Sequence, residues 1–341
     1  MRRGGTRAAL GLALALGGLS SASAQAQTLK AVQARGTLAC GVNRSLSGFA
    51  ALDSRGAWNG FDVDFCRAVA AAVLGDPAKV RFVPLDVPNR FTALQNGAVD
   101  VLSRNSTWTL SREAELNLQF PVVTYYDGQG FLARGERGML KPEQLAGGRI
   151  CVQSGTTHDT YASDYFESRG LKVDVVAFAT PATLVKAYQS DWCDAITSDV
   201  SQLYALRRLM AAPAQQAIAD VVISKEPLGP VVRQGDAQWF SIIRWTHFAM
   251  VRAEALGISS ATLKAATPPN SAEAERLLSA QPDPFEALGL APGALTRIVR
   301  DVGNYGEVYD RNLGAGSGLG IPRGLNRLTR DGGLQFAPAL R

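Results

Sequence analysis

The stretch VDVLSRNSTWTLSR, residues 99–112, joins a short apolar segment to a cluster of hydroxyls, an amide, an aromatic ring and an arginine. Residues 99–102 predict a strand, and a polar loop over 103–112 begins at its carboxyl end. Hydroxyls and backbone N–H groups donate hydrogen bonds, and Arg112 can clamp a carboxylate with two parallel bonds. The loop therefore predicts a site for a small acid, although a polar surface loop with a solvated arginine would have the same composition.

Upstream of this stretch, the pattern alternates between strands and helices. Apolar residues four apart predict an amphipathic helix over 61–74, between strands over 36–42 and 80–85, and a short helix follows over 89–96. Such alternation is typical of an open α/β sheet, in which ligands bind at the carboxyl ends of the strands.

Downstream, the same alternation returns, and polar residues again follow the strands. Strands are expected over 129–134, 148–152, 171–178 and 193–197, and helices from 159 and over 181–190. The turn QSGTT, ending in Thr156 and Thr157, opens a helix whose free N–H groups favour an anion. Asp199 follows the last strand, so two polar loops and one acid are expected at three strand ends.

The N-terminus indicates where the protein works. Arginines at positions 2, 3 and 7 precede an apolar run over 8–19, and small residues follow over 21–27. This pattern is typical of a secretory signal peptide, cleaved after Ala24 or Ala26, and we take 1–24 as the signal. No later segment approaches 18 apolar residues in a row, so we expect a soluble mature protein in the periplasm.

Charge and histidine spacing exclude two classes of function. Removal of the signal takes away three arginines and no acid, so the formal net charge falls from +5 to +2. A nearly neutral chain lacks the basic surface that nucleic-acid binding needs. The two histidines, His158 and His247, lack metal-ligand spacing, so we expect no metal and no cofactor.

Four cysteines in an exported chain favour disulfides over free thiols. The order along the sequence suggests the pairs Cys40–Cys66 and Cys151–Cys193, each within one lobe of the fold described below. Loops of this size would contribute about 3–4 kcal/mol each. The alternative is four free buried thiols.

Five ordered motifs give the chain a resemblance to the polar amino-acid group of periplasmic solute-binding proteins, which feed ABC importers. They are GFDVDFCRAVA (60–70), FTALQNGAVDV (91–101), TWTLSR (107–112), QSGTT (153–157) and CDAITSD (193–199). ISKEPLGPVVRQGDAQWF (223–240), the helix after it and VGNYGEVYDRN (302–312) are similar to the general L-amino-acid-binding branch. The resemblance implies a two-lobed α/β fold of type II with two crossovers and the ligand between the lobes.

The resemblance also implies roles for individual residues. Arg112 would clamp the ligand α-carboxylate, supported by Thr107 and the backbone at Asn105. Thr156 or Thr157 would meet the same carboxylate from the second lobe. Asp199 would accept the α-ammonium, and Phe49 or Leu46 would lie along the ligand side chain. Both charges of a zwitterion need partners, because a buried unpaired charge is costly.

Three positions depart from the family pattern, and Asp199 has an alternative role. Asn43 stands where many relatives carry an acid, Leu46 where many carry an aromatic residue, and Arg104 where relatives often have a small residue. Arg104 could favour acidic ligands or could point into solvent. Asp199 could simply cap the helix that follows it.

The resemblance implies lobe 1 over 28–125 and 229–341, and lobe 2 over 126–228. The part beyond Glu254 exceeds a minimal relative, and docking on the permease is one role for it. We expect a monomer that binds L-amino acids, with broad specificity, and delivers them to membrane permease subunits of an ABC transporter. Two alternatives stay open: an enzyme on the same scaffold, such as a dehydratase, and a ligand-sensing component.

Overall fold

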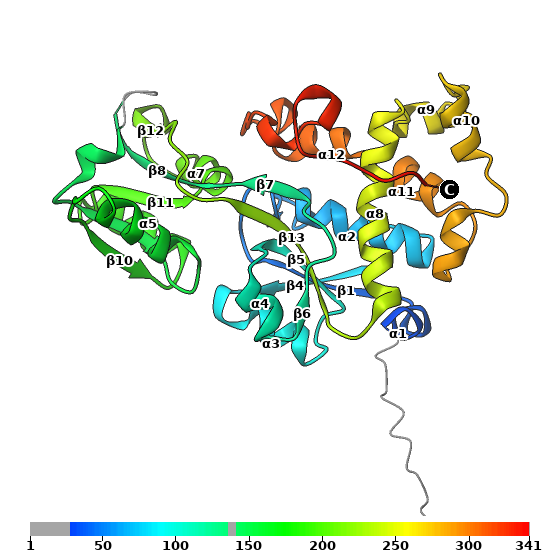
Figure 1. The fold of residues 1–341 in the computed structure, drawn as a ribbon, viewed down its shortest axis with the longest axis horizontal. Coiled ribbons are helices and arrows are strands. Elements are labelled where there is room, and N and C mark those ends of the chain that lie inside the picture. The colour runs from blue at the N-terminus through cyan, green and yellow to red at the C-terminus, as the bar shows by residue number, and fades with distance from the viewer. Residues whose placement is uncertain (1–27, 136–140, 341) are drawn as a thin grey trace, which may run out of the picture.

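The computed structural model describes residues 28–135 and 141–340, which form two α/β lobes joined by two neighbouring strands (Figure 1). The two-lobed α/β architecture expected from the sequence is therefore confirmed. The expected signal peptide, residues 1–24, lies outside the described residues. Within the part of the chain that is described, no helix is both long and apolar enough to cross a membrane.

The sheet of the first lobe has the order β4-β1-β5-β13-β6, and β7 also pairs with β13. β1 runs parallel to β4 and β5, whereas β13 runs antiparallel to β5. The strands are β1 (Leu38–Asn43), β4 (Val80–Leu85), β5 (Val101–Thr107), β6 (Leu118–Gln119), β7 (Tyr125–Asp127) and β13 (Glu226–Arg233). A two-stranded ribbon, β2 (Ala51–Leu52) and β3 (Trp58–Asn59), and the helices α1 (Thr28–Arg35), α2 (Phe61–Leu74), α3 (Arg90–Gln95) and α4 (Leu110–Ala114) complete this part.

The sheet of the second lobe repeats this plan in the order β10-β9-β11-β8-β12. β9 runs parallel to β10 and β11, and β8 runs antiparallel to β11 and β12. The elements are β8 (Gln129–Arg134), β9 (Arg149–Gln153), α5 (His158–Glu167), β10 (Asp174–Phe178), α6 (Pro181–Gln189), β11 (Ala195–Asp199), α7 (Val200–Arg207) and β12 (Gln216–Ile218). In both lobes, the carboxyl ends of the parallel strands point to the edge where ligands bind in α/β sheets.

The two lobes are connected by β7 and β13, which pair with each other where the chain crosses (Figure 1). Glu226 of β13 is opposite Asp127 of β7, and further along β13 Leu228 is opposite Thr107 of β5. β13 thus begins at the hinge and continues as a full member of the first sheet. A change of angle between the lobes would be absorbed at this pair of strands.

Helix α2 is buried on all sides, whereas the sequence predicted an amphipathic helix. Twelve of its fourteen residues are buried, because C-terminal helices cover the side that would otherwise face water. The two acids of its first turn make hydrogen bonds to residues outside the helix, and not only contacts at the helix end. Asp64 accepts hydrogen bonds from Arg67 (2.9 Å), Arg311 (2.8 Å) and Asn312 (2.7 Å). A helix that is apolar all round requires such cover.

The covering helices belong to the part of the chain after the second crossover. They are α8 (Ala237–Ala255), α11 (Ala294–Asp301) and α12 (Tyr305–Asn312), and the same part of the chain includes α9 (Ser260–Lys264), which packs on α11, and α10 (Ala272–Leu278). α8 packs with α2 and buries Trp239, whose indole N–H donates to the Asp100 carbonyl (3.0 Å). The C-terminal part is therefore part of the core of the first lobe.

Strand β5 extends further than the sequence predicted. Residues 103–107, assigned to a polar loop, continue the strand because Ser106 and Thr107 pair with Gly229 and Leu228 of β13. The strand partner comes from more than a hundred residues away, and no local pattern reveals it. The polar side chains are consequently held on a sheet and not on a free loop.

Both expected disulfides are present. Cys40 of β1 bonds to Cys66 of α2 with 6.2 Å between their Cα atoms, and Cys151 of β9 bonds to Cys193, just before β11, with 5.8 Å. Each bridge lies inside one lobe and is fully buried. The bridges therefore stabilise each lobe and leave the hinge free to bend.

The bridge between β1 and α2 gives a stability prediction. Replacing Cys40 and Cys66 together by Ala should lower the free energy of unfolding by about 2–5 kcal/mol, because the unfolded chain regains the freedom of that loop. Urea denaturation followed by circular dichroism measures this loss. Reduction of the wild-type protein breaks both bridges and should lower the free energy of unfolding by more than the double substitution does, and an unchanged unfolding midpoint in both experiments would contradict the prediction.

Candidate binding site

A pocket lies between the lobes, at the carboxyl ends of the parallel strands. From the first lobe it is lined by Asn43, Val87, Arg90, Arg104, Asn105, Thr107 and Arg112; from the second, by Gln153, Thr156, Thr157, His158, Asp199 and Gln202. The lining is almost entirely polar, with cations on one side and an acid on the other. Two charged walls of opposite sign suit a ligand that carries both charges.

Six of the eight expected ligand-binding residues lie on this pocket, and two do not. Leu46 and Phe49 are buried in the core of the first lobe, with exposed fractions of 4% and 1%. The ring of Phe49 packs edge-on against Phe61 (6.1 Å) and Tyr125 (5.5 Å). These apolar side chains pack at the N-terminal end of α2. Burial there stabilises them more than contact with a polar pocket would.

Arg112 is positioned by the start of helix α4. Thr109 caps this helix and accepts a hydrogen bond from the Arg112 N–H (3.3 Å). The Nη1 of Arg112 donates to the Thr107 carbonyl (2.7 Å), and the guanidinium lies over the ring of Phe91. Burial lowers the pKa of Arg112, and the charges of Glu226 and Asp199 oppose that shift. Nε and Nη2 make no hydrogen bond among the described residues, so they are available to a carboxylate.

Asn105 lies on the pocket, and its backbone has a left-handed conformation with φ of 32°. Asn is among the few residues other than Gly that adopt such angles readily. Asp62, at the start of α2, fixes this turn by accepting hydrogen bonds from the Asn105 N–H (3.1 Å) and the Ser103 hydroxyl (3.2 Å). Burial raises the pKa of Asp62 to about 7. The core helix α2 thus shapes one wall of the pocket.

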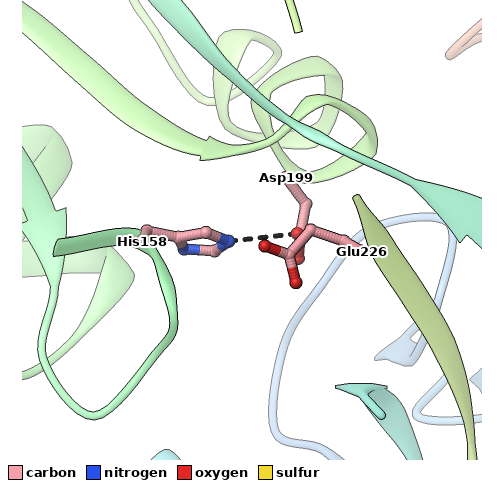
Figure 2. Close-up of side chains that lie close together, drawn as sticks. All are labelled: His158, Asp199 and Glu226. Atoms are coloured by element: carbon pink, nitrogen blue, oxygen red, sulfur yellow. Dashed lines mark hydrogen bonds and ion pairs between the residues drawn. The ribbon is translucent and has the colours of Figure 1, made fainter. Parts of the chain in front are cut away.

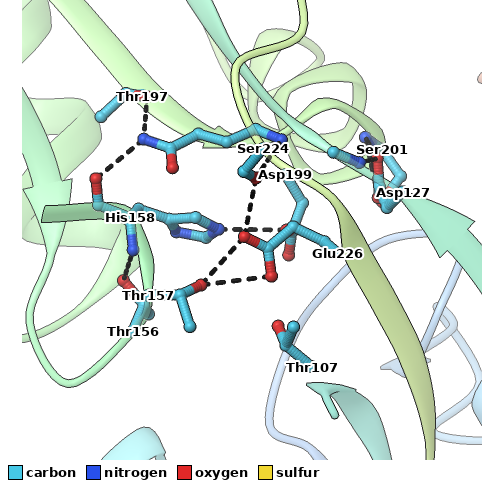
Figure 3. Close-up of polar contacts among 12 residues, drawn as sticks. Thr107, Asp127, Thr156, Thr157, His158, Thr197, Asp199, Ser201, Ser224 and Glu226 are labelled. Atoms are coloured by element: carbon cyan, nitrogen blue, oxygen red, sulfur yellow. Dashed lines mark hydrogen bonds and ion pairs between the residues drawn. The ribbon is translucent and has the colours of Figure 1, made fainter. Parts of the chain in front are cut away.

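In the second lobe, Thr156 and Thr157 lie where β9 turns into α5, as expected. The Thr156 hydroxyl donates to the Gln153 carbonyl (2.7 Å), and the Thr157 hydroxyl donates to the Glu226 carboxylate (3.1 and 3.2 Å) (Figure 3). Gln129 supports the same turn from β8 by donating to the His158 carbonyl (2.8 Å). The hydroxyls of Thr156 and Thr157 therefore both have hydrogen-bond partners within the protein.

Asp199 ends β11 and faces His158 and Glu226 (Figure 2). Its Oδ1 lies 3.0 Å from Nε2 of His158, and all three side chains are buried. Asp199 precedes α7 but its side chain makes no capping hydrogen bond, so helix capping does not account for it. The carboxylates of Asp199 and Glu226 outweigh burial and raise the pKa of His158.

Glu226 is a second carboxylate beside Asp199, although it is not among the residues that line the pocket, and it was not expected from the sequence. It is fully buried, accepts a hydrogen bond from the Ser224 hydroxyl (2.8 Å) as well as from Thr157, and forms no ion pair among the described residues. The only available signal was an acid at the start of an apolar strand in the quoted motif ISKEPLGP. Arg90, His158 and Gln202 were also missed as pocket residues, because their contribution depends on how the lobes meet.

His158, Asp199 and Glu226 could together hold a cation, since one ligand atom of each lies within 4.8 Å of the others. A metal ion would require a deprotonated imidazole. The raised pKa of His158 opposes that state. The cluster is better suited to an ammonium group, which can donate hydrogen bonds to both carboxylates.

Asp127 is a third acid near Asp199 and Glu226, and it lies in the hinge. It accepts hydrogen bonds from the N–H groups of Gly128 (2.9 Å) and Ser201 (3.3 Å), and it is opposite Glu226 in the paired strands (Figure 3). Burial and the neighbouring Asp199 raise the pKa of Asp127 to about 8. The hinge therefore holds a carboxyl that keeps its proton at neutral pH.

Comparison with known proteins identifies the type of protein to which this site belongs. Residues 38–255 match the family described as bacterial extracellular solute-binding proteins, family 3. The chain is 47% identical to the general L-amino acid-binding periplasmic protein AapJ of Rhizobium johnstonii, over 98% of both chains. It is 46% identical to the glutamate/glutamine/aspartate/asparagine-binding protein BztA of Rhodobacter capsulatus, over 96% of this chain and 97% of the relative.

Solved structures agree with this result. A periplasmic binding protein from Brucella ovis with glutathione bound has a TM-score of 0.88 and 46% identity, over 92% of this chain and 99% of that chain. An ancestral arginine-binding protein bound to arginine has a TM-score of 0.55 and 27% identity, and covers 66% of this chain although 95% of its own. The resemblance inferred from the sequence and the type II fold are therefore confirmed.

The raised pKa of Asp127 has a measurable consequence. A carboxyl that holds its proton more tightly when folded stabilises the fold below its unfolded pKa of about 4, and this contribution is lost as the pH rises through about 8. Asp127→Asn should therefore reduce the fall in unfolding free energy between about pH 5 and pH 8, because an amide has no such proton to lose.

Urea denaturation at several pH values in this window measures the slope for both proteins. Asp164→Asn, on the exposed side of α5, is the matched control and should keep the wild-type slope. If Asp127→Asn also kept that slope, the carboxyl would already be ionised at neutral pH.

Proposed function

Because the chain belongs to family 3 of the bacterial extracellular solute-binding proteins, we propose that it binds L-amino acids outside the cytoplasm and delivers them to an ABC importer. Its relatives, which include a general L-amino acid-binding protein and a binding protein for four amino acids, support this proposal. The family is one of binding proteins, so we assign the chain no catalytic step.

The observation that carries the proposal is the separation of charge across the pocket. Arg112 lies on the first lobe with two free donor atoms, while Asp199 on the second lobe and Glu226 at the hinge supply carboxylates. An α-amino acid carries both complementary charges within a few bonds of each other. Each charge-assisted bond to it would contribute about 1.5–3 kcal/mol.

The proposed roles follow from these positions. Arg112 clamps the α-carboxylate, with Thr107 and the Asn105 backbone beside it, and Thr156 and Thr157 contribute from the second lobe. Asp199 accepts the α-ammonium, and Glu226 is a second acceptor for it. Since each wall satisfies only one end of the ligand, closure of the lobes is coupled to binding.

The proposal includes the organisation of the chain. Residues 1–24 are a signal peptide that directs the protein to the periplasm. Lobe 1 comprises 28–125 and 229–341, and lobe 2 comprises 126–228. The mature protein acts as a monomer, and its closed form presents both lobes to the permease subunits of the transporter.

The carboxylate clamp can be tested by a single substitution. Arg112→Ala should weaken binding of L-amino acids by about 2–4 kcal/mol, or roughly thirtyfold to a thousandfold, because the main partner of the α-carboxylate is lost. Calorimetric titration of the ligand-free protein measures this effect. Arg55→Ala, at an arginine that is 88% exposed, should bind as the wild type does. Normal binding by Arg112→Ala would show that the carboxylate is held elsewhere.

The ammonium site predicts a difference between ligand types. Asp199→Asn should weaken α-amino acids far more than the matching carboxylates that lack the amino group, since only the former lose an ion pair. Titrations of both ligand types against wild type, Asp199→Asn and Asp164→Asn separate the effects. Equal losses for the two types of ligand would indicate that Asp199 acts only through the structure of the lobe.

A further inference from the structure

Two further arginines line the pocket besides the proposed clamp. Arg90 begins α3 and Arg104 lies in β5, and both are more than nine-tenths buried, with exposed fractions of 4% and 6%. Within residues 28–135 and 141–340, neither side chain forms an ion pair, and the same is true of Arg112. Two buried cations and the part-buried Arg112 therefore share one wall, and among the described residues none of them has a carboxylate in contact.

The guanidinium groups of both arginines have donor atoms left over. Arg104 donates from Nε to the Leu85 carbonyl (2.9 Å), and its two terminal nitrogens make no hydrogen bond among the described residues. Arg90 donates from Nη1 to the Val87 carbonyl (2.7 Å) and from Nη2 to the Gly155 carbonyl (3.5 Å), so only its buried Nε has no partner among the described residues. A fork with free terminal nitrogens is the geometry that binds a carboxylate with two bonds.

The electrostatic environment indicates that this wall is short of negative charge. Burial and the neighbouring arginines lower the pKa of Arg90 to about 8, and burial lowers that of Arg104 to about 10. Asp62 and Asp86 offset part of the effect on Arg104. However, Asp86 pairs with Arg44 (3.0 Å), and the pKa of Asp62 is itself raised to about 7. An anion beside Arg104 would relieve both the repulsion and the unmet hydrogen bonds.

We propose that Arg104, supported by Arg90, forms a subsite for a second anionic group, so that the preferred ligands are dicarboxylic L-amino acids. This proposal rests on the proposed function, in which Arg112 takes the α-carboxylate. A neutral amino acid would leave both buried arginines, Arg90 and Arg104, without a counter-charge. Glutamate or aspartate supplies a further negative charge on the same side of the pocket.

The two arginines have different parts in this subsite. Arg104 faces the pocket with two free nitrogens and would touch the side-chain carboxylate. Arg90 holds the turn before α3 through Val87, lies over the ring of Phe91 (4.5 Å) and reaches the Gly155 carbonyl of the other lobe at 3.5 Å. Arg90 is therefore a positioning residue that adds positive charge, and Arg104 determines specificity.

The test compares ligands of nearly identical shape and different charge. Calorimetric titrations of the ligand-free mature protein with L-glutamate against L-glutamine, and L-aspartate against L-asparagine, measure the preference for the acid. The wild type should bind each acid about tenfold or more tighter than its amide. Arg104→Gln should reduce that ratio to about threefold or less by weakening the acid alone. Arg55→Gln, with the same loss of charge on the surface, should leave the ratio unchanged.

The outcomes separate this proposal from the one on which it rests. If no amino acid bound the wild type, the proposed function would fail. If acids and amides bound the wild type equally, or Arg104→Gln weakened both alike, only the anionic subsite would be refuted. Should Arg104→Gln not fold by circular dichroism, Arg104→Lys keeps the charge and should retain a preference for each acid over its amide; equal binding of acid and amide by a folded Arg104→Lys would overturn the proposal.

Discussion

The structure depends on charges that are buried at the meeting of two lobes and are only partly compensated there. Arg90, Arg104 and Arg112 line one wall without an ion pair among the described residues, and Asp199 and Glu226 lie close together on the other side, with His158 in contact with Asp199. Buried charge without a partner is costly, and the cost is removed when a ligand supplies the opposite charges. A protein built in this way has the electrostatics that the proposed zwitterionic ligand requires.

Each part of the fold contributes to holding these groups in place. The carboxyl ends of parallel strands bring the polar residues of both lobes to a single edge, and Asp62 of the core helix α2 fixes the unusual backbone of Asn105. The crossover strands β7 and β13 place Asp127 and Glu226 opposite each other at the hinge. The disulfides lie inside the lobes. Each lobe is thus held by its own disulfide, and the pair of strands β7 and β13 is where a change of angle between the lobes would be absorbed.

Local sequence patterns predicted most of the elements, because periodicity and turn residues act over short distances. The range of α2 and the pairing of the four cysteines agree with the structure. Residues whose surroundings come from distant parts of the chain were predicted less well. Strand β5 is longer than expected because β13 pairs with its end. Phe49 lies in the core against Tyr125. Glu226 joins the candidate site only through its contact with Thr157. None of these contacts has a signal within the segment itself.

The measurement that tests the account most directly is a crystal structure of the mature protein with an L-amino acid bound. The account predicts the α-carboxylate within hydrogen-bonding distance of the Arg112 guanidinium and the α-ammonium against Asp199, with both lobes in contact with the same ligand molecule. A ligand seated in the opposite orientation, or held by one lobe while these two side chains remain without contact to it, would contradict the account.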